Sequence, residues 1–244
     1  MCGRSSLTKN EKEIEKRFNS TFYSDELVRY NPLPSYNVAP SHLHPVITNQ
    51  DPNHINLYKW GLIPFWAKDE KIAYKMINAR KETVLEKNAF RKSMESRRCI
   101  VPFDGFYEWK REGKTKRPFY VTTTNVDIFT VAGLWEKWIS KSTGDPVFTF
   151  TILTQEPNDF MSNIHDRMPA ILLPDQEQTW LDMSLSPQEA LKIIEPYPNE
   201  WMQAIEVGPA VGNVRNNDPS LIKEIEKKEE KPDKPEGPVQ GTLF

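Results

Sequence analysis

The second residue of the chain is a cysteine, followed by a glycine and an arginine. An initiator methionine is commonly removed before a small residue, and Cys2 would then carry a thiol and a free α-amine on adjacent carbons. The amine titrates near ~7.7–8 and the thiol near ~8.5, so part of the amine is nucleophilic at neutral pH. Such an amine forms an imine with an aldehyde, and the thiol can close the imine into a thiazolidine ring. On the dipeptide alone, an arbitrary second residue is the more frequent explanation.

Metal chemistry is not indicated by the sequence. The second cysteine, Cys99, and the four scattered histidines do not have the spacing of a zinc site. The chain also lacks the H-x-E and P-C-x-x-C segments of the zinc deaminases. We therefore expect no metal and no cofactor.

Seven short segments occur along the chain in a characteristic order. They are Cys2-Gly3-Arg4, 36–40 (YNVAP), 60–64 (WGLIP), 77–80 (INAR), 105–109 (GFYEW), 164–169 (IHDRMP) and 211–214 (VGNV). In this order they resemble the SOS-response-associated peptidase family, also known as abasic-site processing proteins. The resemblance implies a protein that senses abasic sites in single-stranded DNA and bonds covalently to them through Cys2.

The resemblance gives catalytic roles to three further residues. Asn78 would hold the Cys2 adduct, for which an amide offers a donor and an acceptor without adding charge. Glu108 would move protons during imine formation, and its aromatic neighbours should raise its pKa by desolvation. The alternative for Glu108 is a strand carboxylate facing solvent. His165 would contact the sugar oxygens and assist ring opening or β-elimination, although a lone histidine is more often structural.

Arginines beside these residues would grip the DNA backbone. Arg4, Arg80 and Arg167 lie in the matching segments, and a guanidinium group binds phosphate in a bidentate manner. The alternative is that they pair with local carboxylates, and Asp166 is the nearest in sequence to Arg167.

Loop residues could add further DNA contacts. Phe65 and Trp66 could stack on a base or lie beside the lesion, or they could fold onto the core instead. Asn37 and Pro40 are expected to shape the pocket wall. Arg215 is a further candidate for a phosphate contact.

Two other functions remain open. Cys2 could be the N-terminal nucleophile of a peptidase, with activity limited to removal of Met1, but the sequence identifies no peptide substrate. The protein could also be a non-catalytic binder of single-stranded DNA.

Composition limits where the protein works and how it binds. The 244 residues contain no run of about 20 apolar residues and no signal peptide, so we expect a cytoplasmic, nucleoid-associated monomer without a membrane partner. A net charge of −2 is unusual for a DNA-binding protein. DNA would therefore bind in a local basic groove over a few nucleotides.

The pattern of elements predicts an α+β fold. A first helix is expected at 9–18 and another at 82–96, with short helices at 157–163, 175–183 and 187–195. Strands are expected at 54–60, 98–103, 105–110, 118–123, 128–135, 147–154, 201–207 and 210–214, with a hairpin turn at Gly113. Residues 31–45 read as a tight, proline-rich connector. Strands and helices do not alternate regularly, so we expect a single domain at 1–222 with a mixed, partly barrel-like β core surrounded by short helices.

The last residues, 223–244, are rich in Lys, Glu and Pro and are expected to be disordered. They end in Gln240, Leu243 and Phe244 at a spacing that resembles the Q-x-x-L-F peptide by which bacterial repair proteins dock on the sliding clamp. The sequence therefore predicts a clamp-binding peptide at this end, with chance occurrence as the alternative.

Overall fold

Residues 2–226 are described by the structure, which is a computed structural model. The predicted clamp-binding residues Gln240, Leu243 and Phe244 lie outside the described residues. The strands within this part are β1 Ser5–Leu7, β2 Thr21–Phe22, β3 Ser35–Val38, β4 Leu43–Thr48, β5 Asp51–Trp60, β6 Asn78–Arg80, β7 Arg98–Phe103, β8 Gly105–Glu112, β9 Thr115–Thr123, β10 Phe129–Ile139, β11 Pro146–Gln155, β12 Met168–Pro169, β13 Ile171–Leu172 and β14 Met202–Glu206.

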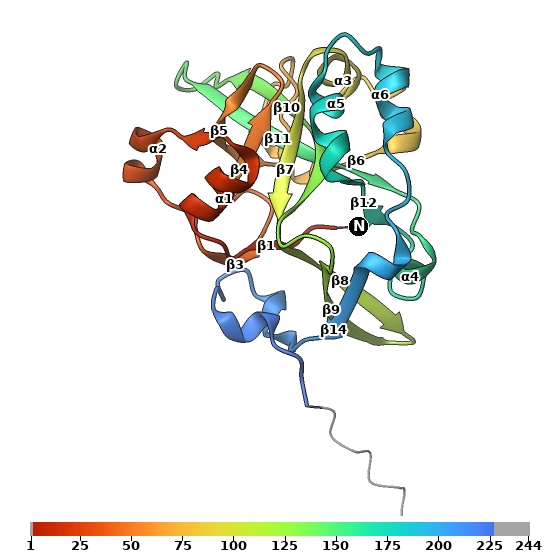
Figure 1. Ribbon diagram of the computed structural model, residues 1–244. Coiled ribbons are helices and arrows are strands. Elements are labelled where there is room, and N and C mark those ends of the chain that lie inside the picture. The colour runs from red at the N-terminus through yellow and green to blue at the C-terminus, as the bar shows by residue number, and fades with distance from the viewer. Residues whose placement is uncertain (1, 227–244) are drawn as a thin grey trace, which may run out of the picture.

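Short helices surround these strands (Figure 1). The α-helices are α1 Glu11–Phe18, α2 Ser24–Arg29, α3 Arg91–Ser96, α4 Asp159–Ser162, α5 Glu177–Leu181 and α6 Pro187–Ile193. The 3₁₀ helices are η1 Glu70–Lys75, η2 Lys81–Thr83, η3 Pro174–Gln176, η4 Asn199–Trp201, η5 Pro209–Gly212 and η6 Pro219–Ile222. No helix within residues 2–226 is long and apolar enough to cross a membrane.

Five strands close into a barrel. Antiparallel pairs join β5 to β4, β4 to β7, β7 to β10 and β10 to β11. A parallel pairing of β11 with β5 completes the ring, with Thr149 opposite Lys59 and Phe150 opposite Trp60. The prediction of an α+β fold with a partly barrel-like core is therefore confirmed.

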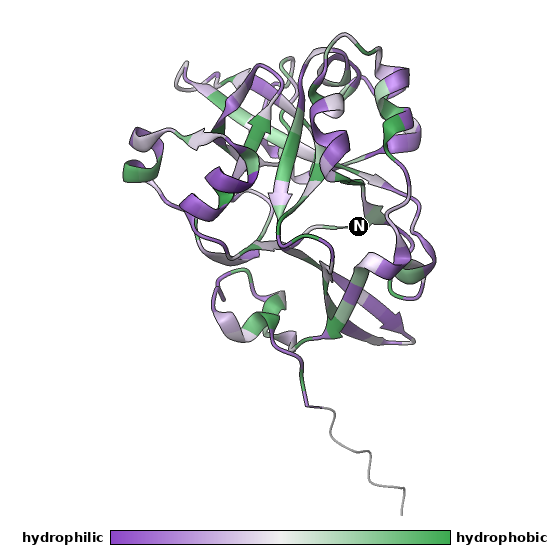
Figure 2. Cartoon of the chain, in the orientation of Figure 1, coloured by the Kyte–Doolittle hydropathy of each residue, from purple (hydrophilic) through white to green (hydrophobic). Residues whose placement is uncertain are grey.

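The barrel strands serve two cores, because successive side chains of a strand point to opposite faces. In β7, Cys99 and Val101 belong to an aromatic-rich cluster together with Phe150 of β11. Ile100 between them belongs to a second cluster, to which α5 contributes Trp180. Both faces of β7 are thus buried, which explains its nearly unbroken apolar sequence. Figure 2 shows hydrophobic colours along β7 and hydrophilic ones on α1 and on the β8–β9 hairpin.

A smaller sheet, in the order β14–β9–β8–β1–β3, lies beside the barrel (Figure 1). The β8–β9 hairpin pairs Glu112 with Thr115, so its turn consists of Gly113 and Lys114. Gly113 has a φ of 59°, a left-handed conformation that glycine adopts without steric cost. The predicted hairpin turn at Gly113 is confirmed.

Most predicted elements occur with shifted ends. The first helix begins at Glu11 because Asn10 caps it, accepting a hydrogen bond from the Glu13 N–H. The strands predicted at 98–103 and 147–154 fall in β7 and β11, and the short helices predicted at 157–163, 175–183 and 187–195 fall at α4, α5 and α6.

Three predictions about local structure are wrong. Residues 82–96 do not form one helix, because Val84 and Phe90 are both buried in the same core cluster from the non-helical stretch before α3. Residues 210–214 are not a strand, because Pro209 begins a 3₁₀ turn there. Residues 31–45 are not a mere connector, since they hold β3 and the start of β4. Pro45 is tolerated in β4 because β7 pairs only with the later residues Ile47 and Thr48.

Candidate active site

Strand β1 brings the N-terminal residues alongside β8. Ser5 lies opposite Phe106, and the carbonyl oxygen of Arg4 accepts a hydrogen bond from the Tyr107 N–H at 2.9 Å. Because the pairing is antiparallel, the residues before Arg4 run toward Glu108. The register of two strands therefore places Cys2 near this carboxyl group.

Asp104 fixes β1 in this register. Its carboxylate accepts hydrogen bonds from the Ser6 hydroxyl at 2.5 Å and from the backbone N–H and hydroxyl of Thr8 at 2.6 and 2.5 Å. The Ser6 hydroxyl also lies 2.8 Å from the Tyr120 hydroxyl. The sequence marks this site only by the dipeptide Asp104-Gly105 between two strands, which is typical of a turn. The positioning role of Asp104 emerges only from the three-dimensional contacts.

Cys2 is fully buried and belongs to the same aromatic-rich cluster as Phe150. Its Sγ lies 3.9 Å from the carbonyl oxygen of Arg4. Burial raises the pKa of the Cys2 thiol well above its usual range, and the charge of Glu108 raises it further. The thiol is therefore protonated at neutral pH rather than a thiolate.

Asn78 lies against Cys2. It begins β6, which runs parallel to β11 with Asn78 opposite Ile152. Its Nδ2 donates a hydrogen bond to the carbonyl oxygen of Cys2 at 2.8 Å. Its Oδ1 is buried and has no hydrogen-bond partner among the described residues. The structure thus joins two residues that the sequence singled out separately.

Glu108 is buried in β8, with a relative exposure of 2%. This excludes the alternative of a strand carboxylate facing solvent. Burial raises the pKa of Glu108 to about 7, as its aromatic surroundings predicted. A carboxyl group with this pKa can donate and accept protons near neutral pH.

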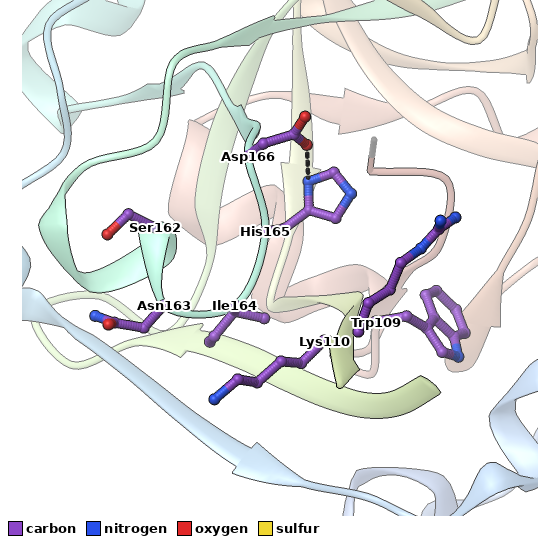
Figure 3. A pocket seen from close by; sticks show the side chains of 8 residues that line it. Trp109, Lys110, Ser162, Asn163, Ile164, His165 and Asp166 are labelled. Atoms are coloured by element: carbon purple, nitrogen blue, oxygen red, sulfur yellow. Dashed lines mark ion pairs between the residues drawn. The ribbon is translucent and has the colours of Figure 1, made fainter. Parts of the chain in front are cut away.

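His165 faces Glu108 from the loop after α4. Its Nε2 lies 3.7 Å from Glu108 Oε2, and its Nδ1 accepts a hydrogen bond from the Arg167 N–H at 3.0 Å. Asp166, which is mostly exposed, also lies 2.9 Å from Nδ1 (Figure 3). Burial lowers the pKa of His165, so the imidazole is neutral at pH 7. Nδ1 thus faces both a donor, the Arg167 N–H, and an acceptor, the Asp166 carboxylate, while Nε2 is directed toward Glu108.

The side chains of Arg4 and Asn37 form hydrogen bonds to other groups of the protein. Arg4 Nη1 donates to Asn37 Oδ1 at 2.7 Å and to the Val211 carbonyl. Asn37 Nδ2 donates to the carbonyl oxygens of Asn213 and Asn216 at 3.1 and 2.8 Å. Together they tie the segment after β14 to the N-terminal residues, while their predicted DNA contacts stay predictions.

The two other arginines have contrasting environments. Arg80 is exposed, and it lies on the same face of β6 as Asn78 because it follows by two residues. Arg167 is buried and holds Glu82 in a bidentate ion pair at 2.9 and 2.8 Å. Its carboxylate partner is therefore Glu82, which sequence proximity did not indicate, and not Asp166. Arg167 could reach a phosphate only by exchanging that partner.

Phe65 and Trp66 are each 49% exposed, so they do not fold onto the core. They line a cavity of about 620 Å³ beside α3, where Lys92 Nζ lies 4.3 Å from the centre of the Phe65 ring. Pro40 lines a different cavity of about 190 Å³. Arg215 is exposed.

Cys2, Asn78, Glu108 and His165 thus converge, although they come from distant parts of the chain. They provide a neutral thiol, an amide, a carboxyl group with a pKa near neutrality and a neutral imidazole. Within residues 2–226, no group of three His, Cys, Asp or Glu side chains could hold a metal ion. The arrangement suits proton transfer around a nucleophile at Cys2.

Solved structures and curated proteins resemble this chain over most of its length. A crystal structure of a protein from Bacteroides thetaiotaomicron is 31% identical, with a TM-score of 0.84, over 92% of this chain and 100% of that one. The abasic site processing protein YoqW of Bacillus subtilis (strain 168) is 45% identical over 225 residues, which cover 91% of this chain and 99% of YoqW. The abasic site processing protein HMCES of Xenopus tropicalis is 30% identical over 92% of this chain and 78% of its own.

A comparison with protein families matches residues 1–214 to the family described as SOS response associated peptidase (SRAP). The match includes Cys2 and the three residues that converge on it. The chain belongs to the SOS response associated peptidase family.

Proposed function

We propose that this protein processes abasic sites in single-stranded DNA by forming a covalent bond to them through Cys2 after removal of Met1. The observation that carries the proposal is the convergence of Asn78, Glu108 and His165 on Cys2. Relatives such as YoqW and HMCES are named abasic site processing proteins, which supports the same substrate. The reaction would take place in the cytoplasm, at the nucleoid.

The first step is attack by the α-amine of Cys2 on the aldehyde carbon of the open-chain deoxyribose. A C–N bond forms, and the carbonyl oxygen becomes a hydroxyl group. Glu108, protonated in part at neutral pH, donates a proton to this hydroxyl, and it leaves as water. The product is a protonated imine between Cys2 and the sugar, in which the nitrogen keeps its last proton.

The thiol of Cys2 then adds to the imine carbon and closes the thiazolidine. Because burial keeps this thiol protonated, ring closure needs a base. The Glu108 carboxylate, left without its proton by the previous step, can accept the thiol proton as the sulfur adds to the protonated imine, whose nitrogen keeps its own proton. Glu108 thus acts first as an acid and then as a base, and one water is released overall.

Asn78 and His165 would position the reacting groups. The Asn78 amide holds the carbonyl oxygen of Cys2, which limits rotation of the nucleophile. The neutral His165 ring, with Nε2 toward Glu108, would contact the sugar oxygens and assist ring opening. Arg80, exposed on the Asn78 face of β6, is the arginine best placed for a phosphate.

The exposed pair Phe65 and Trp66 would stack on a neighbouring base. Lys92 beside the Phe65 ring adds a positive charge to this surface, which favours a polyanion. We include these residues in the DNA-binding surface.

A peptidase with Cys2 as nucleophile is the second candidate, because the family description names a peptidase. Acyl transfer by a cysteine requires a thiolate. The buried thiol of Cys2 has a raised pKa, which favours the amine as the first nucleophile. A non-catalytic binder of single-stranded DNA would not need this buried, convergent cluster.

The deciding test is a denaturing gel. The protein is mixed with a single-stranded oligonucleotide that carries one abasic site, beside an intact oligonucleotide and the Cys2→Ala variant. We expect a slowly migrating band only with wild-type protein and abasic DNA. No such band from a protein whose Met1 is shown by mass spectrometry to be absent would refute the proposal. Peptide cleavage by the same preparation would favour the peptidase.

Cys2→Ala separates the two covalent steps. This variant keeps an α-amine but has no thiol, so the imine cannot close into a ring. We expect a shift from stable crosslinks to a transient imine and strand cleavage by β-elimination. Borohydride should trap the imine, and the absence of any trapped species would show that the amine is not the nucleophile.

We propose further that the C-terminal peptide docks on the replication sliding clamp. Gln240, Leu243 and Phe244 supply a hydrogen-bonding group and two apolar side chains at the spacing of a clamp-binding peptide. Removal of residues 240–244 should abolish retention of the protein on immobilised clamp and leave crosslinking to abasic DNA unchanged. Equal retention of the shortened chain would rule out this docking.

A further inference from the structure

A cavity of about 590 Å³ adjoins the candidate active site. It lies between the end of β8 and the loop after α4 (Figure 3). Trp109 and Lys110 form the β8 side, and Ser162, Asn163 and His165 form the other. Its size is within the ~300–1,000 Å³ range of ligand pockets.

The cavity shares His165 with the candidate active site. His165 lines it and also lies 3.7 Å from Glu108 Oε2. Glu108 immediately precedes Trp109 in β8. A strand whose abasic sugar lay at Cys2 would therefore find this opening beside the reacting carbon.

The charges of the cavity suit an anion. Lys110 and Arg111 contribute positive charge, and Asp166 is the only carboxylate of the lining. Lys110 Nζ lies 3.2 Å from Glu112 Oε1, but both groups are exposed, so this pair is weak and can yield to a phosphate. Arg111 lines the same cavity as His165.

Trp109 adds an aromatic surface. It is half-buried and packs against the hydrophobic cluster that contains Tyr107 and Tyr120, and the Arg4 guanidinium lies 5.9 Å from its ring. An aromatic wall next to two cations is the combination that binds single-stranded nucleic acid, because phosphates meet the cations while a base stacks on the ring.

We propose that this cavity binds the nucleotide on one side of the abasic site, with Arg111 and Lys110 at its phosphate and Trp109 at its base. The proposal rests on the proposed function, because it places the lesion at Cys2. It adds Trp109, Lys110 and Arg111 to the DNA-contacting residues. It also predicts that flanking nucleotides on the two sides contribute unequally to binding.

The test uses oligonucleotides with a tetrahydrofuran in place of the abasic sugar, which cannot form an imine. One carries nucleotides only on the 5′ side of the lesion and one only on the 3′ side. Arg111→Gln and Lys110→Gln are compared with Lys114→Gln, which removes the same charge at the hairpin turn outside the cavity. Equilibrium affinity is measured by fluorescence anisotropy over a salt series.

We expect Arg111→Gln to weaken binding of one of the two oligonucleotides by about 5- to 10-fold at low salt and to reduce its salt slope by about 0.7. The affinity of Arg111→Gln for the other oligonucleotide should stay within twofold of wild type. Lys114→Gln should bind both oligonucleotides within twofold of wild type. Equal losses on the two sides, or no loss in either cavity variant, would overturn the inference. A free 5′-mononucleotide that competes as well as the one-sided strand would reassign the cavity to a free nucleotide.

Crosslinking of true abasic DNA by the wild type is measured in parallel. If it fails while the one-sided loss of binding occurs, the proposed reaction is wrong and the nucleotide site stands. If crosslinking occurs and no one-sided loss is found, the proposed reaction stands and the nucleotide site is wrong.

Discussion

Asn78 donates a hydrogen bond to the carbonyl oxygen of Cys2 at 2.8 Å, and its own side-chain oxygen is buried without a partner among the described residues. One end of the amide thus anchors the proposed nucleophile, and the other end offers an acceptor. A buried acceptor without a donor costs roughly 1–3 kcal/mol. The cost would be recovered when the reacting sugar or amine supplies a donor.

Asn78→Ala should slow crosslinking by about 100-fold, because a small displacement of a reacting group is enough for such a loss. Single-turnover rates on abasic DNA measure the effect, with melting temperature as the check on folding. Asn53→Ala, at an exposed position of β5, is the matched control. A rate within threefold of wild type would show that the Cys2 anchor does not matter for the reaction.

The rate of crosslinking should depend on pH in a bell-shaped manner. The acid limb reflects protonation of the Cys2 amine, and the alkaline limb reflects loss of the proton from Glu108, whose pKa burial raises to about 7. Glu108→Gln should remove the alkaline limb and lower the maximum by about 10²- to 10⁴-fold. An alkaline limb that persists in this variant would assign it to another group.

Glu108 should also make stability depend on pH. Burial raises its pKa from 4.5 to about 7, so the folded protein binds this proton more tightly than the unfolded chain. Its stabilising contribution is full below about pH 4.5 and is lost as the pH rises through 7. We subtract the free energy of unfolding of the wild type from that of Glu108→Gln. This difference should rise by roughly 3 kcal/mol between pH 4.5 and 8, because only the wild type loses the contribution of the proton.

Urea unfolding at a series of pH values measures this gain. Glu112→Gln, in the exposed part of the same strand, is the control and should show no gain at alkaline pH. A flat difference for Glu108→Gln would mean that the carboxyl group titrates normally in the folded protein.

Arg80 and Arg167 should respond differently to removal of their charge. Arg80→Gln should reduce the salt slope of single-stranded DNA binding by about 0.7 and leave the melting temperature unchanged, because Arg80 is exposed. Arg167→Gln should lower the melting temperature by several degrees, because it removes the guanidinium that donates to Glu82 and to the Thr154 carbonyl. A fall in the salt slope with Arg167→Gln at unchanged stability would mean that DNA displaces Glu82.

Gly105→Ala should disrupt the contact between β8 and β9. A Cβ at this position would lie 2.3 Å from the ring and hydroxyl of Tyr120, which also contacts Ser6 of β1. We expect a loss of more than about 3 kcal/mol in unfolding free energy. Gly113→Ala in the same hairpin meets no atom within 4 Å and should cost only about 1–2 kcal/mol from its left-handed backbone. Similar losses in the two variants, measured by urea unfolding, would contradict the steric explanation.

Local sequence patterns determined the elements that carry the site. Alternating and continuous apolar runs located β7 and β11, and the Gly113 turn located the β8–β9 hairpin, because these signals depend on neighbouring residues only. The chemistry available at Cys2 and the aromatic surroundings of Glu108 were likewise visible in the sequence. The same local reasoning failed at 82–96, where the burial of Val84 and Phe90 overrides helical periodicity.

Only the tertiary structure decided which residues meet. Asn78 and Cys2 are 76 residues apart, and Arg167 and Glu82 are 85 apart. No propensity or spacing specifies such contacts, because they arise from the pairing of β6 and β12 with β11 and from the hydrogen bonds of Asp104 to β1. Sequence thus supplied the candidate groups, while long-range strand pairing decided that Asn78 and Glu108 lie at Cys2 and that the Arg167 guanidinium is held by Glu82.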